Sequence, residues 1–330
     1  MSADQRAPGM SSPLAVDAEA ELAQVVVGLR GARHRWRTAQ GRPHDAQSRE
    51  LPSREVLARV VEGLRGALFP MRLGPPELRP DSEDYFVGHT LATVLSCLRT
   101  QVLLELKHDA RQRGETPAAG LEQQAQVVVA AFAVALPDIR ELLDSDVLAA
   151  YRGDPAARSV DEVLLCYPGI RATIHHRLAH ELYRQGVPLV ARVIAELAHG
   201  ETGIDIHPGA QIGPGLFIDH GTGVVIGETC VIGQRVRIYQ NVTLGAKSFP
   251  AKSDGSLEKG LPRHPVVEDD VVIYAGATVL GRITIGQGSV IGGNVWLTRG
   301  VPAGSQVNQA DADTQCRPPA GAIGGAERAD

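Results

Sequence analysis

Residues 226–245 read IGETCVIGQRVRIYQNVTLG, and a small aliphatic residue recurs in them at every sixth position. The same spacing extends to both sides, over residues 206–297. The aliphatic positions are Ile206, Ile212, Ile218 and Val224, then Ile226, Ile232, Ile238 and Leu244 after a two-residue shift, and Ile273, Val279, Ile285, Ile291 and Leu297 after a break. Neither an α-helix nor an ordinary strand has this period. It is typical of the hexapeptide repeat of a parallel β-helix, in which the aliphatic side chain points inward and glycine permits a tight corner.

The composition predicts a protein that binds neither nucleic acid nor membranes. The formal net charge is −5, which is mild. No apolar run reaches the roughly 18 residues of a membrane span. Aromatic residues make up 4% of the chain and glycine occurs 36 times, which suits narrow coils without room for rings. The cysteines, Cys97, Cys166, Cys230 and Cys316, are far apart and form no Cys-x-x-Cys motif, so we expect free thiols and a cytoplasmic location.

The pattern predicts an α+β protein with an N-terminal helical domain followed by the β-helix. We expect residues 1–13 to be disordered, 14–200 helical, 201–302 a hexapeptide-repeat β-helix, and 303–330 a flexible tail. Helical apolar spacing occurs over residues 18–37, 55–68, 85–113, 120–136, 139–151, 169–185 and 188–199. We expect prolines to separate these helices, at Pro137, Pro155, Pro168 and Pro188.

One polar insertion, residues 246–262, interrupts the repeat. A β-helix coil can extrude a loop at a corner without breaking its strand ladder. The insertion returns directly into Arg263-His264-Pro265, so we interpret it as a flap over a functional site. A solvated surface loop is the alternative.

Titratable residues gather in three short segments at expected turns, where side chains point outward. These are Asp205-Ile-His-Pro208, Asp219-His220-Gly-Thr-Gly223 and Arg263-His264-Pro265. Asp205 and His220 are 15 residues apart, slightly less than one coil of about 18, so we expect them on adjacent coils and on a similar side. An aspartate beside a histidine can hold one imidazole tautomer and support a general base that deprotonates an alcohol. Arg263 is suited to bind a carboxylate group, because a guanidinium can donate two parallel hydrogen bonds to it.

The same segments resemble the signature of the serine O-acetyltransferases, a family of hexapeptide-repeat acyltransferases. The resemblance lies in Asp205-Ile-His-Pro, Asp219-His-Gly-Thr-Gly-Val-Val-Ile-Gly-Glu-Thr229, Tyr239-Gln-Asn-Val-Thr-Leu-Gly245, Arg263-His-Pro and Ala275-Gly-Ala-Thr-Val-Leu-Gly281, and extends upstream through Asp154-Pro-Ala. It covers roughly residues 140–302, about half of the chain. It implies a left-handed β-helix and transfer of an acetyl group from acetyl-CoA to L-serine, the first step of cysteine biosynthesis. The chain looks like a long-loop variant with an N-terminal helical extension.

The resemblance also implies a role for each site residue. His220 would be the general base and Asp205 would orient it. Asp154 and Asp219 would bind the serine ammonium, Arg263 its carboxylate, and His264 would help to place the hydroxyl. The acetyl-CoA groove would be lined by Gly245, Ala246, Ala275 and Gly276. Serine would attack the thioester directly, with no permanently bound cofactor and no metal.

The resemblance implies a homotrimer or a dimer of trimers, with grooves for the acyl donor between neighbours. Many family members end in an isoleucine that inserts into cysteine synthase. This chain ends Glu327-Arg-Ala-Asp330, so the expectation for that complex stays open.

Three other interpretations remain open at this point. The first is a hexapeptide acyltransferase for another acceptor, such as a sugar, an antibiotic or another amino acid. The second is a zinc carbonic anhydrase of the γ type, in which His207, His220 and His264 would have to converge across a subunit boundary. The third is a β-helix scaffold without catalytic activity.

Overall fold

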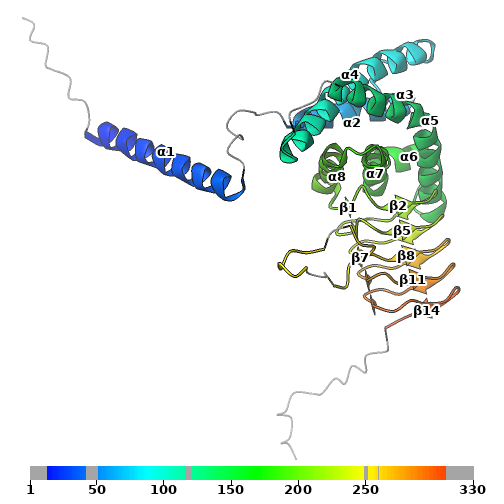
Figure 1. Ribbon diagram of the computed structural model, residues 1–330. Helices are drawn as coiled ribbons and strands as arrows, with labels where there is room; N and C mark the ends of the chain where they lie inside the picture. The colour runs from blue at the N-terminus through cyan, green and yellow to red at the C-terminus, as the bar shows by residue number, and fades with distance from the viewer. Residues whose placement is uncertain (1–12, 42–50, 116–119, 249–251, 259, 310–330) are drawn as a thin grey trace, which may run out of the picture. The chain divides into compact units, whose positions relative to one another are not determined.

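The computed structural model describes residues 13–41, 51–115, 120–248, 252–258 and 260–309. The chain divides into two units, Met1–Leu51 and Pro52–Asp330, and each is described by itself. The first unit contains helix α1 (Pro13–Ala39). The second contains the other helices and all the described strands (Figure 1). No helix within the described ranges is long and apolar enough to cross a membrane.

The helices of the second unit pack around one core. They are α2 (Arg54–Leu68), α3 (Pro70–Leu73), the 3-10 helix η2 (Pro80–Ser82), α4 (Glu83–Gln112), α5 (Leu121–Gly153), α6 (Val160–Cys166), α7 (Pro168–Arg184) and α8 (Pro188–Thr202). The break predicted at Pro137 was wrong, because α5 is continuous through it. Proline removes one helical hydrogen bond, but Leu136 and Ile139 on either side of it are buried in the core, and this packing holds the helix together.

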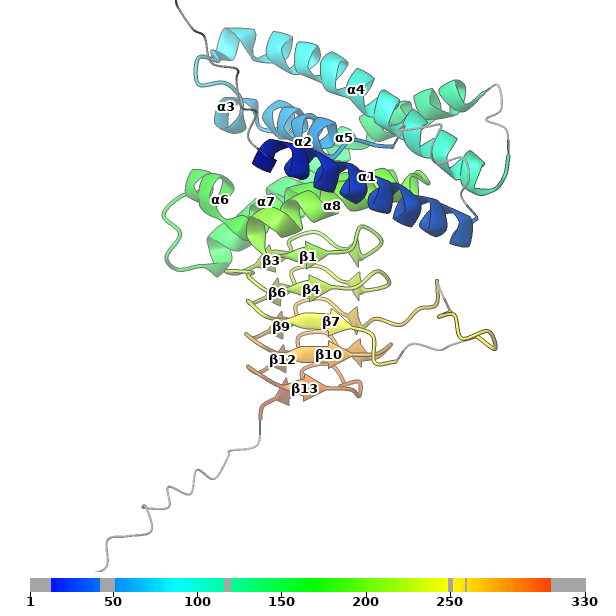
Figure 2. The same cartoon turned by 90° about the vertical axis from the view of Figure 1, so that its left-hand side faces the viewer.

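The strands form the three sides of a parallel β-helix. Their bounds are β1 (Asp205–Ile206), β2 (Gln211–Ile212), β3 (Phe217–Ile218), β4 (Val225–Ile226), β5 (Val231–Ile232), β6 (Arg237–Ile238), β7 (Thr243–Gly245), β8 (Val266–Val267), β9 (Val272–Ile273), β10 (Thr278–Leu280), β11 (Thr284–Ile285), β12 (Val290–Ile291), β13 (Trp296–Leu297) and β14 (Gln306–Val307). Sheet A contains β1-β4-β7-β10-β13, sheet B contains β2-β5-β8-β11, and sheet C contains β3-β6-β9-β12-β14. The coils stack below α7 and α8 (Figure 2).

The two-residue shift in the repeat lies at one corner of the first coil. Asp205 of β1 pairs with Val225 of β4, 20 residues later, whereas Val225 pairs with Thr243 of β7, only 18 residues later. Ile218 ends β3 and the corresponding residue Ile226 ends β4, eight residues later instead of six, so the two additional residues lie between these strands, in the turn that carries His220. This corner is therefore longer than its neighbours, and it is a place where a side chain can project.

The aliphatic positions of the repeat form the core of the β-helix. Ile206, Ile218, Val224, Ile226, Ile232, Ile238, Leu244, Ile273, Val279, Ile285 and Ile291 are buried, and Ile212 and Leu297 at the two ends are partly buried. Cys230 also lies in this core, where burial raises the pKa of its thiol to about 12 and keeps it unreactive. Cys97 and Cys166 are free and exposed, and Cys316 lies outside the described residues.

The strand ladder differs from the expected domain limits at its C-terminal end. The β-helix does not stop at residue 302, because β14 (Gln306–Val307) pairs with β12. Only residues 310–330 of the expected tail, and residues 1–12 at the other end, lie outside the described residues. The insertion 246–262 leaves the ladder intact, since β8 after it pairs with both β5 and β11. Its described parts extend to the side of the coil stack after β7 (Figure 2).

A buried ion pair joins the helices to the first coil. The Arg177 guanidinium of α7 lies 3.0 Å from a carboxylate oxygen of Asp146 on α5 and donates to the carbonyl oxygens of Ile212 and Gly213. Asp146 in turn accepts from the backbone N–H of Leu216, at 2.8 Å. Arg177 and Asp146 thus form hydrogen bonds with backbone groups of the segment between β2 and β3. These bonds fix the position of the coil that carries His220.

A second buried carboxylate accepts hydrogen bonds at the N-terminus of α8. Because this group is buried, we expect the free energy of unfolding to depend on pH. Glu105 of α4 is fully buried and accepts from the backbone N–H groups of Leu189 and Val190, both at 2.7 Å. Burial raises the pKa of this carboxyl to about 7, although the two N–H groups lower it. Between about pH 4.5 and 7 the folded chain holds a proton that the unfolded chain has released, so the free energy of unfolding falls as the pH rises through this window, by on the order of 1–3 kcal/mol.

We expect Glu105→Gln to remove this component of the pH dependence, because glutamine does not titrate. Urea denaturation at a series of pH values between 5 and 8 measures it. Glu141→Gln is the matched control, since Glu141 lies exposed on α5. If the slopes of the Glu105→Gln variant and the control are equal, Glu105 is not the group that titrates.

Candidate active site

The first cluster of site residues lies at the edge of the β-helix where sheet C turns into sheet A. We call it the acidic corner, and it comprises Asp154, Tyr167, Asp219, His220 and Arg237. Asp154 accepts a hydrogen bond from the Tyr167 hydroxyl and one from the backbone N–H of Ala156, which hold the pKa of its carboxyl below the ordinary value. The same bond raises the pKa of Tyr167 to about 12. At neutral pH Asp154 is therefore an anion and Tyr167 a neutral donor.

Arg237 links several parts of the acidic corner. Its guanidinium lies 2.7 Å from Asp219 and donates to the carbonyl oxygen of Gly153 at the end of α5, at 2.8 Å. It also stacks on the rings of Phe217 and Tyr239. One arginine facing Asp154 and Asp219 leaves about one net negative charge beside His220, which suits a small cation such as an ammonium group.

The backbone of the long turn presents His220 to solvent. His220 has a left-handed φ of 58° and a side chain that is 73% exposed, with its Nε2 atom 3.8 Å from Asp219. The next residue, Gly221, has a φ of 82°, and a Cβ there would come within 2.4 Å of the Ile204 side chain. Only glycine fits this position. The imidazole therefore stands at the outer end of a tightly fixed turn.

Asp205 lies near this turn but contacts a different partner. The residues next to His220 and Asp205 in the chain, Gly221 and Ile204, are in direct contact. Within the described part of the chain, however, no hydrogen bond or ion pair joins Asp205 to His220. Asp205 instead lies 3.9 Å from Arg192 of α8, which binds Glu196 at 2.6 Å. The orientation of His220 by Asp205 remains a prediction.

The second cluster lies at the next edge, where sheet A turns into sheet B. We call it the basic corner, and it comprises Glu228, Thr229, Arg263 and His264. Arg263 donates to Glu228 at 2.6 Å, and Glu228 also accepts from the Tyr183 hydroxyl of α7 at 3.1 Å. Burial alone would raise the pKa of Glu228, but these two donors lower it, so it stays ionised. The pair holds the Arg263 side chain at the surface, where it is 25% exposed.

Thr229 fixes the tautomer of His264. The Thr229 hydroxyl oxygen accepts from the backbone N–H groups of Arg263 and His264, at 2.9 and 3.1 Å. The backbone N–H of Thr229 donates to Nδ1 of His264 at 3.1 Å, so the ring proton lies on Nε2. Burial, and then the Arg263 charge, lower the pKa of His264 to about 4. His264 is thus a neutral hydrogen-bond donor at physiological pH.

The ring of His264 occupies the space above a glycine. A Cβ on Gly227 would come within 2.0 Å of the His264 ring, so glycine is required there for the ring to adopt its place. Arg263 and His264 were predicted from the sequence. The residues that hold them were not, and neither were two members of the acidic corner: Tyr183, Glu228, Thr229, Tyr167 and Arg237. Glu228 and Thr229 do lie within a quoted motif, whereas Tyr167, Tyr183 and Arg237 carry no signal in the sequence.

The two corners lie at opposite edges of sheet A. His220 precedes β4 of sheet A, and Glu228 and Thr229 follow it. β4 (Val225–Ile226) lies between them, and within the described residues no hydrogen bond or ion pair joins the two corners. The structure therefore brings Asp154, Asp219 and His220 together, and Arg263 with His264, but it does not join the two groups.

The residues expected to line the acetyl-CoA groove divide in the same way. Ala275 and Gly276 lie between β9 and β10, on the edge of the acidic corner. Gly276 has a φ of 74°, and a Cβ there would lie 2.2 Å from the Asn294 side chain. Gly245 ends β7 on the edge of the basic corner, and Ala246 follows it. The expected serine site and the expected acetyl-CoA groove are thus both divided between the edge of the acidic corner and the edge of the basic corner.

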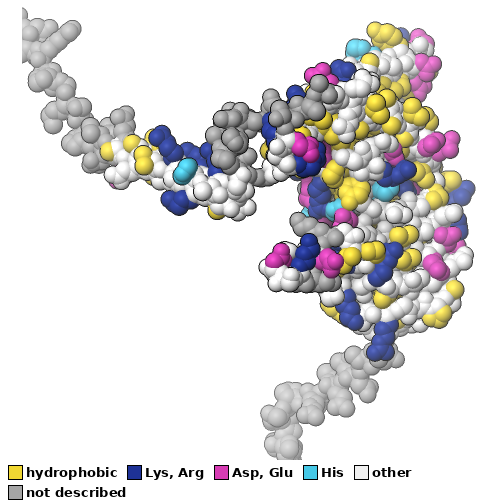
Figure 3. Space-filling model, in the orientation of Figure 1, with side chains coloured by type: hydrophobic (Ala, Val, Ile, Leu, Met, Phe, Trp, Pro, Cys, Tyr) yellow, Lys and Arg dark blue, Asp and Glu magenta, His cyan; other side chains and the backbone are white. Residues whose placement is uncertain are grey.

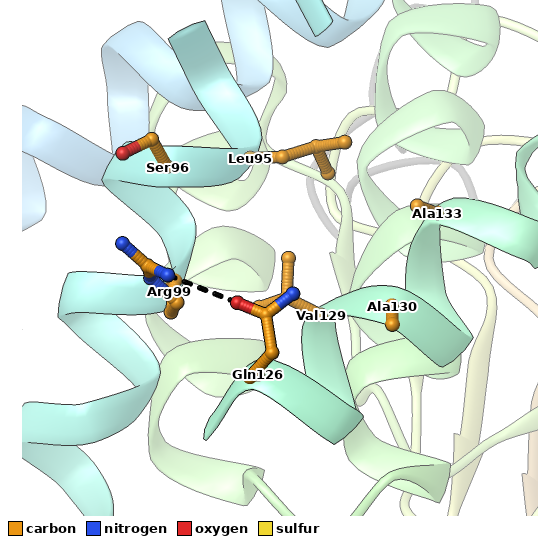
Figure 4. A pocket seen from close by; sticks show the side chains of 7 residues that line it. All are labelled: Leu95, Ser96, Arg99, Gln126, Val129, Ala130 and Ala133. Carbon is orange, nitrogen blue, oxygen red and sulfur yellow. Dashed lines mark hydrogen bonds between the residues drawn. The ribbon is translucent and has the colours of Figure 1, made fainter. Parts of the chain in front are cut away.

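Other clusters and hollows of the described chain offer less chemistry. Glu196, His199 and Asp205 have ligand atoms within 4.8 Å of one another and could hold a metal ion, but Arg192 already binds two of them. A cavity of about 310 Å³ between α4 and α5 is lined mainly by small and apolar side chains, and its arginine, Arg99, donates to Gln126 at 2.9 Å (Figure 4). It contains no candidate acid or base.

Comparison with known proteins identifies the family. The model of the bacterial transferase hexapeptide (six repeats) matches residues 264–299. A protein of Synechococcus elongatus named "Serine acetyltransferase, plasmid" is 61% identical over 262 residues, which cover 79% of this chain and 82% of that protein. The chain belongs to the serine acetyltransferase family.

Other members of the serine acetyltransferase family agree with this. The serine acetyltransferase of Mycobacterium tuberculosis is 51% identical over 162 residues, 49% of this chain and 67% of that protein. The crystal structure of serine acetyltransferase isoform 3 from Entamoeba histolytica, in complex with cysteine, matches with a TM-score of 0.66 and 38% identity, over 79% of this chain and 84% of that one. These similarities confirm the predicted acyltransferase and the helical domain followed by a left-handed β-helix.

Proposed function

We propose that this enzyme transfers the acetyl group of acetyl-CoA to the hydroxyl of L-serine, giving O-acetyl-L-serine and CoA, in the first step of cysteine biosynthesis. The proposal rests on the chemistry of the two corners: the acidic corner exposes His220 beside two carboxylates, and the basic corner holds Arg263 at the surface beside the buried, neutral His264. An α-amino acid with a hydroxyl group needs these partners: anions for its ammonium, a guanidinium for its carboxylate, and a base for its proton.

The acidic corner would bind the amine and activate the hydroxyl. Asp154 and Asp219 face the ammonium, and His220 Nε2 takes the proton from the serine Oγ as this atom attacks the thioester carbon. The new bond is Oγ–C and the bond that breaks is C–S. The imidazolium then returns its proton to the departing thiolate of CoA, and Asp205 stabilises the imidazolium and its orientation.

The basic corner would bind the carboxylate and place the reacting groups. One Nη atom of Arg263 donates to Glu228, and the rest of the guanidinium would donate to the serine carboxylate. The neutral His264 presents its Nε2–H toward the reacting oxygens, and the tautomer set by Thr229 makes it a donor there. No permanently bound cofactor is needed, because acetyl-CoA supplies the acetyl group as a co-substrate.

Two copies of the chain would complete each site. The acidic edge of one β-helix and the basic edge of a neighbour bring Asp219 and His220 to Arg263 and His264. Because these are different edges of the same prism, the contact is heterologous, and three copies close it into a ring with three equal sites. The same contact would join Ala275 and Gly276 of one copy to Gly245 and Ala246 of the next, around acetyl-CoA. This geometry supports a homotrimer.

We expect CoA release from acetyl-CoA to depend on L-serine, measured with a thiol reagent against a panel of acceptors. Arg263→Lys should raise the KM for serine about 10-fold or more and lower kcat less, because lysine keeps the charge but loses the planar fork. Arg299→Lys is the matched control, since Arg299 lies exposed after β13, on the same edge of the β-helix. A higher rate with a sugar or another amine than with serine would instead support a different acceptor.

A further inference from the structure

Arg282 joins three successive coils at the edge of the basic corner. Strands β5, β8 and β11 pair in register in sheet B. Thr229, His264 and Arg282 each lie two residues before one of these strands, so they occupy equivalent positions on successive coils. The Nη1 atom of Arg282 donates to the carbonyl oxygen of Thr229 at 2.6 Å and to that of His264 at 3.1 Å. One guanidinium nitrogen therefore links the two segments that form the basic corner.

The two carbonyl groups that Arg282 binds have no backbone partner. Within the described ranges no backbone N–H donates to the carbonyl oxygen of Thr229 or of His264. The ladder resumes beside them, where the backbone N–H of Val231 donates to the carbonyl oxygen of Pro265 at 3.2 Å. His264 is buried, and a buried carbonyl group without a donor is costly. Arg282 thus supplies hydrogen bonds that the backbone of the interrupted coil does not.

The segment that Arg282 binds is the one by which the insertion 246–262 returns to the β-helix. This segment carries Arg263 and His264, whose backbone N–H groups donate to the Thr229 hydroxyl oxygen. The backbone of His264 is thus held by Thr229 at its N–H and by Arg282 at its carbonyl oxygen. Burial is the largest cause that lowers the pKa of His264 to about 4, and the Arg282 charge acts in the same direction.

The charge of Arg282 is not used by a carboxylate of the described chain. Arg282 is exposed, and among the described residues it forms no ion pair. Figure 3 shows Lys and Arg side chains on the surface of the coils below the insertion. An exposed arginine at this edge could instead serve a phosphate of acetyl-CoA, but the hydrogen bonds of Arg282 are directed to the two carbonyl oxygens. The geometry therefore favours a role within the basic corner.

We propose that Arg282 is a positioning residue of the basic corner. It holds the returning end of the insertion against the coil of Thr229, so that Arg263 and His264 keep the places in which they meet the acceptor. The inference rests on the proposed function, because it assigns Arg282 to the side of the site that binds the serine carboxylate. Removal of Arg282 would displace these two side chains and leave their chemical groups intact.

The kinetic test compares two substitutions of Arg282 with a control on the same edge. Arg282→Met should lower kcat/KM for serine by about 10–100-fold, as a displacement of about 1 Å can do, and leave the KM for acetyl-CoA unchanged. Arg282→Lys should keep most of the wild-type value, because an ammonium group can also donate to two carbonyl oxygens. Arg299→Met is the matched control and should behave as the wild type, since Arg299 lies exposed on the next coil.

Hydrogen exchange followed by mass spectrometry tests the same inference without any substrate. In full-length Arg282→Met, the backbone N–H groups of Arg263 and His264 should exchange faster than in the wild type, because their segment is released at its carbonyl end. Peptides from β9 and β12 should exchange at the wild-type rate, and the Tm should equal that of Arg299→Met. This pattern separates a local displacement from a general loss of stability.

Three results would overturn the inference. They are wild-type kinetics for Arg282→Met, wild-type exchange at Arg263 and His264, and a raised KM for acetyl-CoA at an unchanged KM for serine, which would assign Arg282 to a phosphate. Failure of the proposed function looks different, because the wild-type enzyme itself would then not turn over serine. The exchange measurement would still decide whether Arg282 holds the basic corner.

Discussion

We expect His220→Ala to lower kcat by about 10²–10⁴-fold, the usual contribution of a general base. The KM for serine should change little, because the ammonium and carboxylate contacts come from other residues. The imidazole is 73% exposed at the end of a turn that Gly221 fixes, so its removal leaves no cavity and should not unfold the chain. Steady-state kinetics with both substrates measure the effect.

Two further variants test the role of the base. His89→Ala removes an exposed histidine on α4 and should leave kcat unchanged. Asp205→Asn should lower kcat in the same direction as His220→Ala but by less, since it removes the orienting charge and not the base. Near-normal turnover of His220→Ala would exclude this residue as the base, and full turnover of Asp205→Asn would mean that Asp205 serves the contact with Arg192 alone.

We expect Asp146→Ala to lower the free energy of unfolding by about 3–5 kcal/mol, because it leaves the Arg177 charge buried without its partner. The side chains of Asp146 and Arg177 are 0% and 5% exposed. Loss of the carboxylate also leaves the backbone N–H of Leu216 without its acceptor. Urea denaturation followed by circular dichroism measures the change.

The control for this effect replaces the whole pair by apolar residues. Asp146→Leu/Arg177→Met should be less destabilised than either single variant, since no charge is then left unpaired in the interior. Asp144→Ala, which breaks the exposed ion pair with Arg140, should cost about 1 kcal/mol or less. If Asp146→Ala is as stable as Asp144→Ala, the buried pair does not hold the helices to the first coil.

The variants also separate stability from catalysis. Asp146 and Arg177 hold the turn between β2 and β3, and β3 leads into the turn of His220. A loosened first coil should therefore reduce activity through the position of His220. His220→Ala, in contrast, should reduce activity at unchanged stability.

The sequence by itself determined the fold of the β-helix. Its hexapeptide period depends on local geometry, because each hexad forms one strand and one corner and the inward position is always aliphatic. The two-residue shift even marked the longer corner, although its position at His220 became clear only from the pairing of Asp205 with Val225. The motifs around His220 and Arg263 selected the candidate site for the same reason, as they are contiguous in the chain.

Only the tertiary structure decided how these residues are grouped and held. Helix α5 passes through Pro137 because the packing of its neighbours outweighs the local penalty. Tyr167, Tyr183 and Arg237 bind site residues that lie 13 to 45 positions away in the chain, so no local sequence pattern indicates their roles. The division of the site between two edges follows from the triangular cross-section of the coil, because one strand of sheet A always separates the corner before it from the corner after it.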